Sequence, residues 1–322
     1  MSLLVLNDEE VRELLDMQSC VEAMEEVLAA LQRGELSMPL RFMFRPPNAT
    51  SLFGFMPAHR AGGAPMYSLK EIVVSPANSA QGLDPHQGAV MLHDGETGKL
   101  VALMNASAVT EIRTAAVSGV ATKLLARPGS RVVAVLGAGV QGRSHIEAMR
   151  AVLDDPEIRL WSRGTARAGA LAEATGATLA ATAEEACAGA DVVCACTSSR
   201  DPVVSLEMLA PGTHVNAVGS SIATARELTS ELVAAASLFV DRRESTVNEA
   251  GDYLFAVEEA GIGPDHIRAE LGELLEGVHP GRRADDELTV FKSLGIAIED
   301  LAAAELVVCR ARERGIGTEV AF

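Results

Sequence analysis

Long apolar runs are missing from this sequence of 322 residues. No segment approaches the roughly 20 consecutive apolar residues that a membrane-spanning helix needs, and residues 1–10 are acidic where a signal peptide would be basic. We therefore expect a cytoplasmic protein. Hydrophobic residues make up 48% and charged residues 22% of the chain, a composition typical of globular proteins, and the length allows two domains with separate cores.

Positive charge is also scarce. The chain has 27 Lys and Arg against 44 Asp and Glu, which gives a formal net charge of −17. Nucleic acids and anionic membranes bind to basic surfaces, so we expect neither as a partner. An anionic ligand would have to be held by a few individually placed Arg and Lys side chains.

The sequence lacks the spacings that metal sites use. Its five cysteines form no CxxC or Cys/His pattern, and its seven histidines form no HExxH pair. We therefore predict no metal. Cys194 and Cys196 lie two apart in an apolar stretch, so they would face the same side of a strand and pack in a core.

What the sequence does contain is a strand, turn and helix pattern beginning at residue 132. The continuous apolar run 132–136 is typical of a strand covered on both faces, and residues 144–151 look helical. Between them is a G-x-G-x-x-G turn, in which glycines permit a sharp bend, close approach of a pyrophosphate and tight helix packing. The helix N-terminus favours an anion. This predicts a dinucleotide site at Gly137, Gly139, Val140, Gln141 and Gly142.

The two sides of this motif differ in pattern. Before it come amphipathic helices and then short strands punctuated by Pro and Gly; after it, strands and helices alternate as in a doubly wound parallel sheet. We expect helices at 11–15 (capped by Asp8), 19–31, 109–125 and 296–314, and strands at 40–44, 51–56, 64–74, 87–93, 100–105, 132–136, 158–161, 191–197, 214–218 and 238–241.

These patterns predict an α/β protein of two domains. Residues 128–300 would form a Rossmann-type NAD(P)-binding domain, because Arg127-Pro128-Gly129 is typical of a boundary. Residues 1–127 together with 301–322 would form an α+β substrate-binding domain, since we expect the last helix to cross back to the N-terminal part.

The end of the second strand bears on the choice of cofactor. An Asp or Glu there would bind the adenosine 2′-hydroxyl of NAD, whereas an Arg suits the 2′-phosphate of NADP. No carboxylate follows Trp161, and the polar residues are Ser162, Arg163, Thr165 and Arg167. A solvated basic helix start would give the same pattern. The sequence favours NADP(H) and leaves NAD(H) possible.

Three cationic residues outside the predicted dinucleotide domain stand out: Arg41, Lys70 and Arg113. Any one of them, taken alone, is more often a solvated surface charge. Taken together they suit a substrate carboxylate held by Arg, with Lys70 as the hydrogen-bonding and proton-handling group beside it.

Several blocks in order along the chain resemble the ornithine cyclodeaminase/mu-crystallin family: Lys70 ending a short strand, 110–116, 137–142, 215–219 and 290–295. The resemblance covers nearly the whole chain. It implies a Rossmann domain and a dimer-forming domain made from the N-terminal part and the C-terminal helix, hence a homodimer. It also implies that Arg41, Lys70 and Arg113 contact a substrate carboxylate and that Met56 lines the same pocket. The cofactor-side positions would include Thr114, Thr197, Val218, Lys292 and Gly295.

One departure separates the activities of the family. The pattern that resembles ornithine cyclodeaminases at this point is Gly-Gly-Asp, and its Asp is the proposed acid–base group. This chain has Gly219-Ser220-Ser221 there instead. A serine hydroxyl does not take up a proton at neutral pH, so Ser221 disfavours cyclodeamination. Mu-crystallin-like members resemble this stretch, and Trp161-x-Arg163, better. Glu71, Glu111 and Asp241 remain as candidate proton donors.

We therefore expect an NAD(P)-dependent oxidoreductase that reduces a small cyclic imino acid (a ketimine carboxylate), or oxidises the amino acid in reverse, by hydride transfer. The expected catalytic residues are Lys70, Arg113 and Ser221. Ornithine cyclodeaminase and alanine dehydrogenase are the alternative enzymes. A protein that binds NADPH and a small ligand with little turnover is the alternative of another class.

Overall fold

The protein, seen here in a computed structural model that describes residues 2–84 and 86–322, divides into two compact units. Unit 1 is Met1–Arg113 with Ile296–Phe322, and unit 2 is Thr114–Gly295. The first division falls inside helix α3 (Ala106–Leu125), earlier than the expected boundary at 127/128. The reason is that α3 serves both units: Arg113 pairs with carboxylates of unit 1, whereas Thr122 accepts a hydrogen bond from Asn216 of unit 2.

Unit 1 is built on one open sheet with the strand order β16-β1-β7-β6-β5-β4-β2, and β3 also pairs with β4. Strands β1 and β7 are parallel, and the other pairs are antiparallel. The terminal strands β1 and β16 were not expected from the sequence. The strands are β1 (Ser2–Leu6), β2 (Leu36–Ser37), β3 (Phe42–Phe44), β4 (Leu52–Arg60), β5 (Met66–Val74), β6 (His86–Asp94), β7 (Leu100–Asn105) and β16 (Thr318–Ala321).

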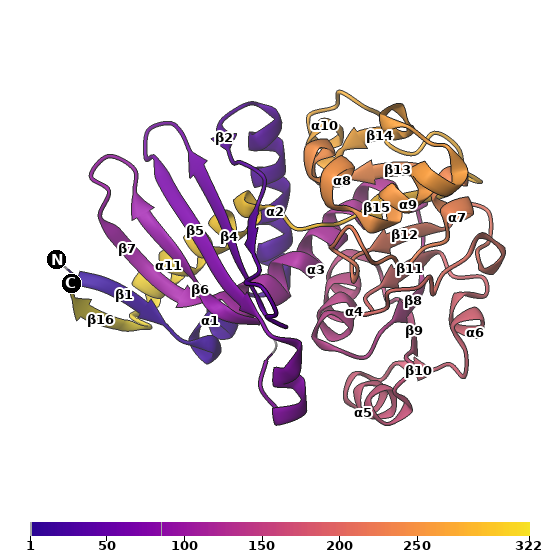
Figure 1. Cartoon of the computed structure of the whole chain (residues 1–322), viewed down its shortest axis with the longest axis horizontal. Helices are drawn as coiled ribbons and strands as arrows, with labels where there is room; N and C mark the ends of the chain where they lie inside the picture. Colours follow the sequence, from indigo (N-terminus) through magenta and orange to yellow (C-terminus); the bar gives the residue numbers. More distant parts are fainter. Residues whose placement is uncertain (1, 85) are drawn as a thin grey trace. The chain divides into compact units, whose positions relative to one another are not determined.

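Helices cover one face of this sheet. The C-terminal helix α11 (Ala297–Arg314) packs on β4, β5 and β6 and against α2 (Met17–Gln32), and it is drawn in yellow behind the strands in Figure 1. Strand β5 alternates accordingly, with Ser68, Lys70 and Ile72 buried and Tyr67 and Val73 exposed.

The first two helices begin at side-chain caps. Helix α1 (Asp8–Leu14) is capped by Asn7, which forms a capping box with Glu10, and α2 is capped by Asp16. The expectation that Asp8 caps α1 was wrong. Asp8 is the first helical residue instead, and its negative charge there interacts favourably with the helix dipole.

Unit 2 has a parallel sheet with the order β10-β9-β8-β11-β12-β15-β13-β14. The expected α/β class with a doubly wound parallel sheet is confirmed. Strand β15, missed by the sequence patterns, lies between β12 and β13. The strands are β8 (Val132–Leu136), β9 (Glu157–Trp161), β10 (Thr178–Leu179), β11 (Val192–Ala195), β12 (His214–Ala217), β13 (Ser237–Val240), β14 (Ile267–Glu270) and β15 (Thr289–Lys292).

The helices of unit 2 alternate with these strands and bury an aliphatic core. Leu136, Val193, Val215 and Leu232 are at most 1% exposed, and Cys194 and Cys196 are buried as expected. Within residues 2–84 and 86–322, no helix is long and apolar enough to cross a membrane. The helices are α4 (Val140–Val152), α5 (Thr165–Thr175), α6 (Ala183–Cys187), α7 (Ser230–Ala235), α8 (Arg243–Glu249), α9 (Gly251–Ala260) and α10 (Leu271–Leu275).

Candidate functional site

The glycine-rich turn joins β8 to α4, and each glycine there has its own constraint. Gly137 has φ +121°, and a Cβ atom on it would lie 2.5 Å from the carbonyl oxygen of Cys196; a Cβ atom on Gly142 would lie 1.9 Å from the carbonyl oxygen of Gly137. These two glycines are required by the packing of the turn itself. Gly139 differs, because a Cβ atom there would meet nothing within 4 Å.

The open space at Gly139 fits a bound anion. Gly139 is the N-cap of α4 and makes no side-chain capping bond, so the first backbone N–H groups of the helix are directed at a prospective ligand. Val140 beside it is 51% exposed. The buried side-chain oxygen of Gln141 has no hydrogen-bond partner among the described residues. The open space at Gly139 therefore fits the pyrophosphate of a dinucleotide, and the side-chain oxygen of Gln141 fits a hydrogen-bond donor of the same ligand.

The polar residues after β9 lie at the same edge of the sheet. Ser162 is half-buried, and Arg163 and Arg167 are exposed. Helix α5 begins at Thr165. The carboxyl ends of β8, β9, β11 and β12 share this edge because the strands are parallel, which is where α/β sheets bind ligands.

A buried carboxylate links the loops that follow β11 and β12. Glu227 is fully buried and accepts hydrogen bonds from the backbone N–H groups of Thr197 (2.6 Å), Gly219 (2.6 Å) and Ser220 (3.2 Å). Burial raises the pKa of the Glu227 carboxyl. Val218, 7% exposed, precedes these glycine and serine residues. Glu227 thereby fixes two strand-end loops to each other.

Lys292 holds the same loop from its carbonyl side. Its ammonium donates to the carbonyl oxygens of Ser220 (2.5 Å) and Ala217 (3.2 Å) and pairs with Asp252 at 2.9 Å. Asp252 in turn accepts from the backbone N–H groups of Glu227 (2.8 Å) and Leu228 (2.9 Å). We name Glu227, Asp252 and Lys292 the loop cluster. Ser221 follows directly on the peptide that this cluster holds.

A second buried cluster lies under α11 in unit 1. The Lys70 ammonium lies 3.0 Å and 2.9 Å from the two carboxylate oxygens of Asp300 and 3.3 Å from the hydroxyl of Thr110. Arg113 donates from Nε to Asp300 (2.9 Å) and from Nη1 to Glu299 (2.7 Å). We name Lys70, Arg113, Glu299 and Asp300 the cation cluster.

The cation cluster is dry, and this changes the acidity of its lysine. The exposed fraction of the whole residue is 2% for Lys70, 3% for Arg113 and 0% for Asp300. Burial lowers the pKa of the Lys70 ammonium to about 8, against the opposing effect of the Asp300 charge. Lys70 can therefore change its protonation state near neutral pH.

The sheet register places Met56 beside Lys70, and Arg41 directly precedes β3, the strand on the other side of β4. Met56 pairs directly with Lys70 across β4 and β5 and is buried. Arg41, which is half-buried, precedes Phe42, the partner of Phe55 on β4. Thr114 follows Arg113 on α3 and is 8% exposed.

The three carboxylates named as candidate proton donors lie elsewhere. Glu111 is bound by Arg12 at 2.6 Å. Asp241 accepts from the backbone N–H groups of Leu294 and Gly295, and burial raises its pKa. Glu71 alternates with Lys70 on β5 and so points to the opposite face.

Sequence reasoning missed the acidic members of both clusters: Asp300, Glu299, Glu227 and Asp252. One signal was available for the first two. Two adjacent carboxylates in the alanine-rich stretch 297–304 occupy helix positions where the surrounding residues are apolar. A buried carboxylate of this kind needs a cationic partner.

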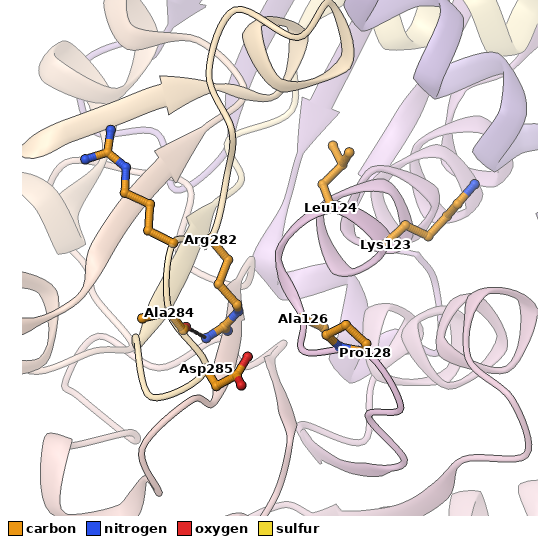
Figure 2. A pocket seen from close by; sticks show the side chains of 8 residues that line it. Lys123, Leu124, Ala126, Pro128, Arg282, Ala284 and Asp285 are labelled. Atoms are coloured by element: carbon orange, nitrogen blue, oxygen red, sulfur yellow. Dashed lines mark hydrogen bonds between the residues drawn. The ribbon is translucent and has the colours of Figure 1, made fainter.

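A cavity of about 350 Å³ lies at the other edge of the unit 2 sheet, where the strands begin. Figure 2 shows Lys123, Leu124 and Ala126 at the end of α3 on one side and Arg282, Ala284 and Asp285 on the other. Arg282 donates to the carbonyl oxygen of Leu125 (2.7 Å) and to the hydroxyl of Thr289 (3.0 Å). Its guanidinium thus joins α3 to β15, away from the glycine-rich turn.

The fold and the two clusters define an α/β protein with a dinucleotide-binding unit and a separate unit that carries buried cations. Residues 1–315 match the model of the Ornithine cyclodeaminase/mu-crystallin family. The chain belongs to this family, as the sequence motifs had indicated.

Relatives support this assignment along the whole chain. Ketimine reductase mu-crystallin of Mus musculus is 38% identical over 308 residues, which are 94% of this chain and 95% of the relative. The structure of Thermococcus litoralis Delta(1)-pyrroline-2-carboxylate reductase in complex with NADH and L-proline is 34% identical, with a TM-score of 0.93, and covers 99% of this chain and 100% of its own. An archaeal alanine dehydrogenase dimer with bound NAD is 33% identical, with a TM-score of 0.93 and full coverage of both chains. The protein is an NAD(P)-dependent oxidoreductase of this family.

Proposed function

We propose that the protein reduces a small cyclic imino acid, a ring in which a C=N bond is next to a carboxylate, to the corresponding cyclic amino acid. The observation that carries this proposal is the pair of buried cations, Lys70 and Arg113, beside the apolar side chain of Met56. This pair suits one carboxylate on a small apolar ring. The reductases of ketimines and of pyrroline-2-carboxylate among the relatives support the same class of substrate.

The residues of unit 1 bind and orient the substrate in this proposal. Arg113 and Arg41 bind the carboxylate, and this clamp fixes the carbon of the C=N bond for reaction. Lys70 donates a hydrogen bond at the carboxylate or imine end and stabilises the charge that develops there. A bound nicotinamide cofactor would supply the hydride.

Ser221 argues against the alternative of cyclodeamination. The loop cluster holds the peptide before it in place, but a serine hydroxyl is a poor proton acceptor at neutral pH. Cyclodeamination needs an acid–base group for amine and water chemistry. Oxidation of an amino acid such as alanine remains a second candidate because of the archaeal alanine dehydrogenase.

The direct test is a substrate panel with the purified protein. Five- and six-membered cyclic imino carboxylates with NADPH or NADH are expected to give stoichiometric cofactor oxidation and the cyclic amino acid. L-Alanine with NAD(P) tests amino-acid oxidation. L-Ornithine with a catalytic amount of NAD tests cyclodeamination, which releases ammonia and proline without net change of the cofactor. Ammonia and proline from ornithine, together with no reduction of the imino acids, would overturn the proposal.

NADP(H) is the cofactor that we propose as preferred, on the basis of Arg163. This exposed Arg and Ser162 follow β9, where an NAD-specific site has a carboxylate. We expect Arg163→Ala to lower kcat/KM for NADPH about tenfold, the loss of one charge-assisted contact, and to leave kcat/KM for NADH within about twofold. Arg268→Ala, which removes another exposed Arg of unit 2, is the matched control. An equal loss with both cofactors would contradict the role of Arg163.

Homodimer formation through unit 1 is also part of the proposal. The uncovered face of its sheet exposes apolar side chains, with Phe42 62%, Phe44 50% and Tyr67 50% exposed. Apolar surface of this kind is typical of protein interfaces. The archaeal alanine dehydrogenase is a dimer. Light scattering should give twice the chain mass of 33.7 kDa, and a Phe42→Asp, Phe44→Asp variant should give a smaller mass. A wild-type protein of monomer mass would contradict this part.

A further inference from the structure

Asp300 is the one member of the cation cluster that contacts both cations. Its Oδ1 accepts from Lys70 Nζ at 3.0 Å and from Arg113 Nε at 2.9 Å. Glu299, its neighbour on α11, pairs with Arg113 through Oε2. A single carboxylate oxygen therefore fixes the distance between the ammonium and the guanidinium.

The contacts of Lys70 fix the orientation of its ammonium. Two acceptors among the described residues, Asp300 and Thr110, receive its hydrogen bonds, and an ammonium has three N–H groups. The direction of the third is set once the first two are fixed. Asp300 and Thr110 thus hold the Lys70 ammonium in one orientation.

The charges of the cluster balance before any substrate arrives. Two cations face two carboxylates, and all four side chains are at most 4% exposed. A buried lysine without a counter-ion loses its proton. The ionisable groups that act on Lys70 and its partners are Asp300, Glu299, Arg113, His86 on β6 and Cys20 on α2. Of these, Asp300 is the carboxylate in direct contact with the ammonium.

We propose that Asp300 is a positioning residue for the reaction, which holds the charged Lys70 ammonium and the Arg113 guanidinium at the spacing that one substrate carboxylate requires. This inference rests on the proposed function, because it assigns Lys70 and Arg113 to the substrate. It adds a residue of the C-terminal helix to the site, although that residue is separated from Lys70 by 230 positions.

Asp300→Asn is the first test, because it keeps the size and an acceptor oxygen but removes the charge. Lys70 loses its proton at lower pH without that charge. We expect the alkaline limb of the kcat/KM profile for pyrroline-2-carboxylate to move at least one pH unit lower, which is at least a tenfold loss above that limb. Titration of the substrate is the same for every variant, so the difference between variants reports on Lys70.

Two further variants separate positioning from a general structural role. In a Lys70→Arg background the charge cannot be lost, so Asp300→Asn should no longer move the alkaline limb. Glu305 also lies on α11 and pairs with Arg60 of β4. Glu305→Gln removes this carboxylate and should leave the alkaline limb in place. A merely structural Asp300 would lower activity equally at all pH values and leave the limb unmoved, which would overturn the proposal.

Asp300→Glu keeps the charge and displaces it by one methylene. It should retain the wild-type alkaline limb but lower kcat by roughly 100-fold, since a misplacement of about 1 Å has that effect. This variant also decides the matter if Asp300→Asn does not fold. Wild-type kcat in Asp300→Glu would overturn the proposal.

Binding of pyrrole-2-carboxylate, a planar ring acid that cannot be reduced, tests the inference without turnover. Calorimetry should show that its affinity is lost at lower pH in Asp300→Asn than in the wild type. Turnover of imino acids by the wild type with an unshifted variant would refute the role of Asp300 alone. No turnover of any imino acid by the wild type would refute the proposed function, and the calorimetric shift would then still decide the role of Asp300.

Discussion

The two buried clusters use similar groups in opposite ways. In the loop cluster of unit 2, Glu227, Asp252 and Lys292 bind mainly to backbone N–H and carbonyl groups of the strand-end loops. In the cation cluster of unit 1, Lys70 and Arg113 bind to carboxylate side chains. The first arrangement fixes the course of the chain. The second holds cations ready for another anion.

The difference teaches that a buried Lys is not by itself evidence of a binding site. Lys292 was expected on the cofactor side, yet its ammonium donates to the carbonyl oxygens of Ser220 and Ala217 and forms an ion pair with Asp252. Its expected cofactor contact stays a prediction. For Lys70, burial lowers the pKa to about 8, which is a property of groups that take part in chemistry.

The largest expected effect is the loss of turnover in Lys70→Ala. Removal of the ammonium should lower kcat/KM for imino acid reduction on the order of 1000-fold, because both charge stabilisation and proton handling are lost. Quenching or enhancement of NADPH fluorescence should show that dinucleotide binding survives. Lys99→Ala, at an exposed position after β6, serves as the control. Unchanged steady-state rates in Lys70→Ala would exclude it from the site.

The next effect compares the two lysines in stability. Lys292→Met leaves Asp252 buried without a cation and should lower the free energy of unfolding by about 3–5 kcal/mol. Lys70→Met should cost less, about 1–3 kcal/mol, because Asp300 keeps its bond to Arg113. Urea unfolding followed by far-UV circular dichroism checks both variants, and the fluorescence of Trp161, the one tryptophan of the chain, reports on unit 2 alone. An equal cost for both would remove the distinction between the clusters.

The effect that is smallest near neutral pH concerns the histidines of unit 2. Burial lowers the pKa of His145 to about 4 and that of His214 to about 3, below the ordinary value of about 6.5. The folded state therefore keeps them neutral while the unfolded state takes up protons. Stability should be present above pH 6.5 and be lost as the pH falls from about 6.5 toward about 4, with up to about 1.4 kcal/mol per pH unit for each histidine.

His145→Gln checks this pH dependence. Urea unfolding followed by Trp161 between pH 7 and pH 4.5 should show a shallower loss of stability in His145→Gln than in the wild type. Asn248→Gln, at an exposed position in unit 2, should keep the wild-type slope. The same slope in all three proteins would show that His145 makes no contribution.

Local patterns in the sequence were sufficient for much of the fold. Helix α3 ends at Leu125 and β7 spans Leu100–Asn105 as expected, because apolar periodicity and turn residues are local signals. The glycine-rich turn was found for the same reason. Strand β15 was missed because its apolar run is only Val290-Phe291, followed by Lys292. Strands β1 and β16 pair with each other from opposite ends of the chain, which no local pattern reveals.

The site was predicted in part, and the missing part is long-range. The cations Lys70 and Arg113 were identified by residue type and by family resemblance. Their pairing with Glu299 and Asp300 could not be predicted, because it joins β5, α3 and α11 across most of the chain. Likewise, Glu227 accepts hydrogen bonds from the backbone N–H groups of Thr197 and Gly219. These bonds depend on the order of the parallel strands in the sheet, which the hydrophobic periodicity of the sequence does not reveal.

A crystal structure with oxidised cofactor and pyrrole-2-carboxylate tests the central claim most directly. We predict that the ligand carboxylate lies within hydrogen-bonding distance of Lys70 Nζ and of the Arg113 guanidinium, with Asp300 still in contact with both. A ligand bound elsewhere, with the four side chains of the cation cluster paired only to one another, would contradict the account.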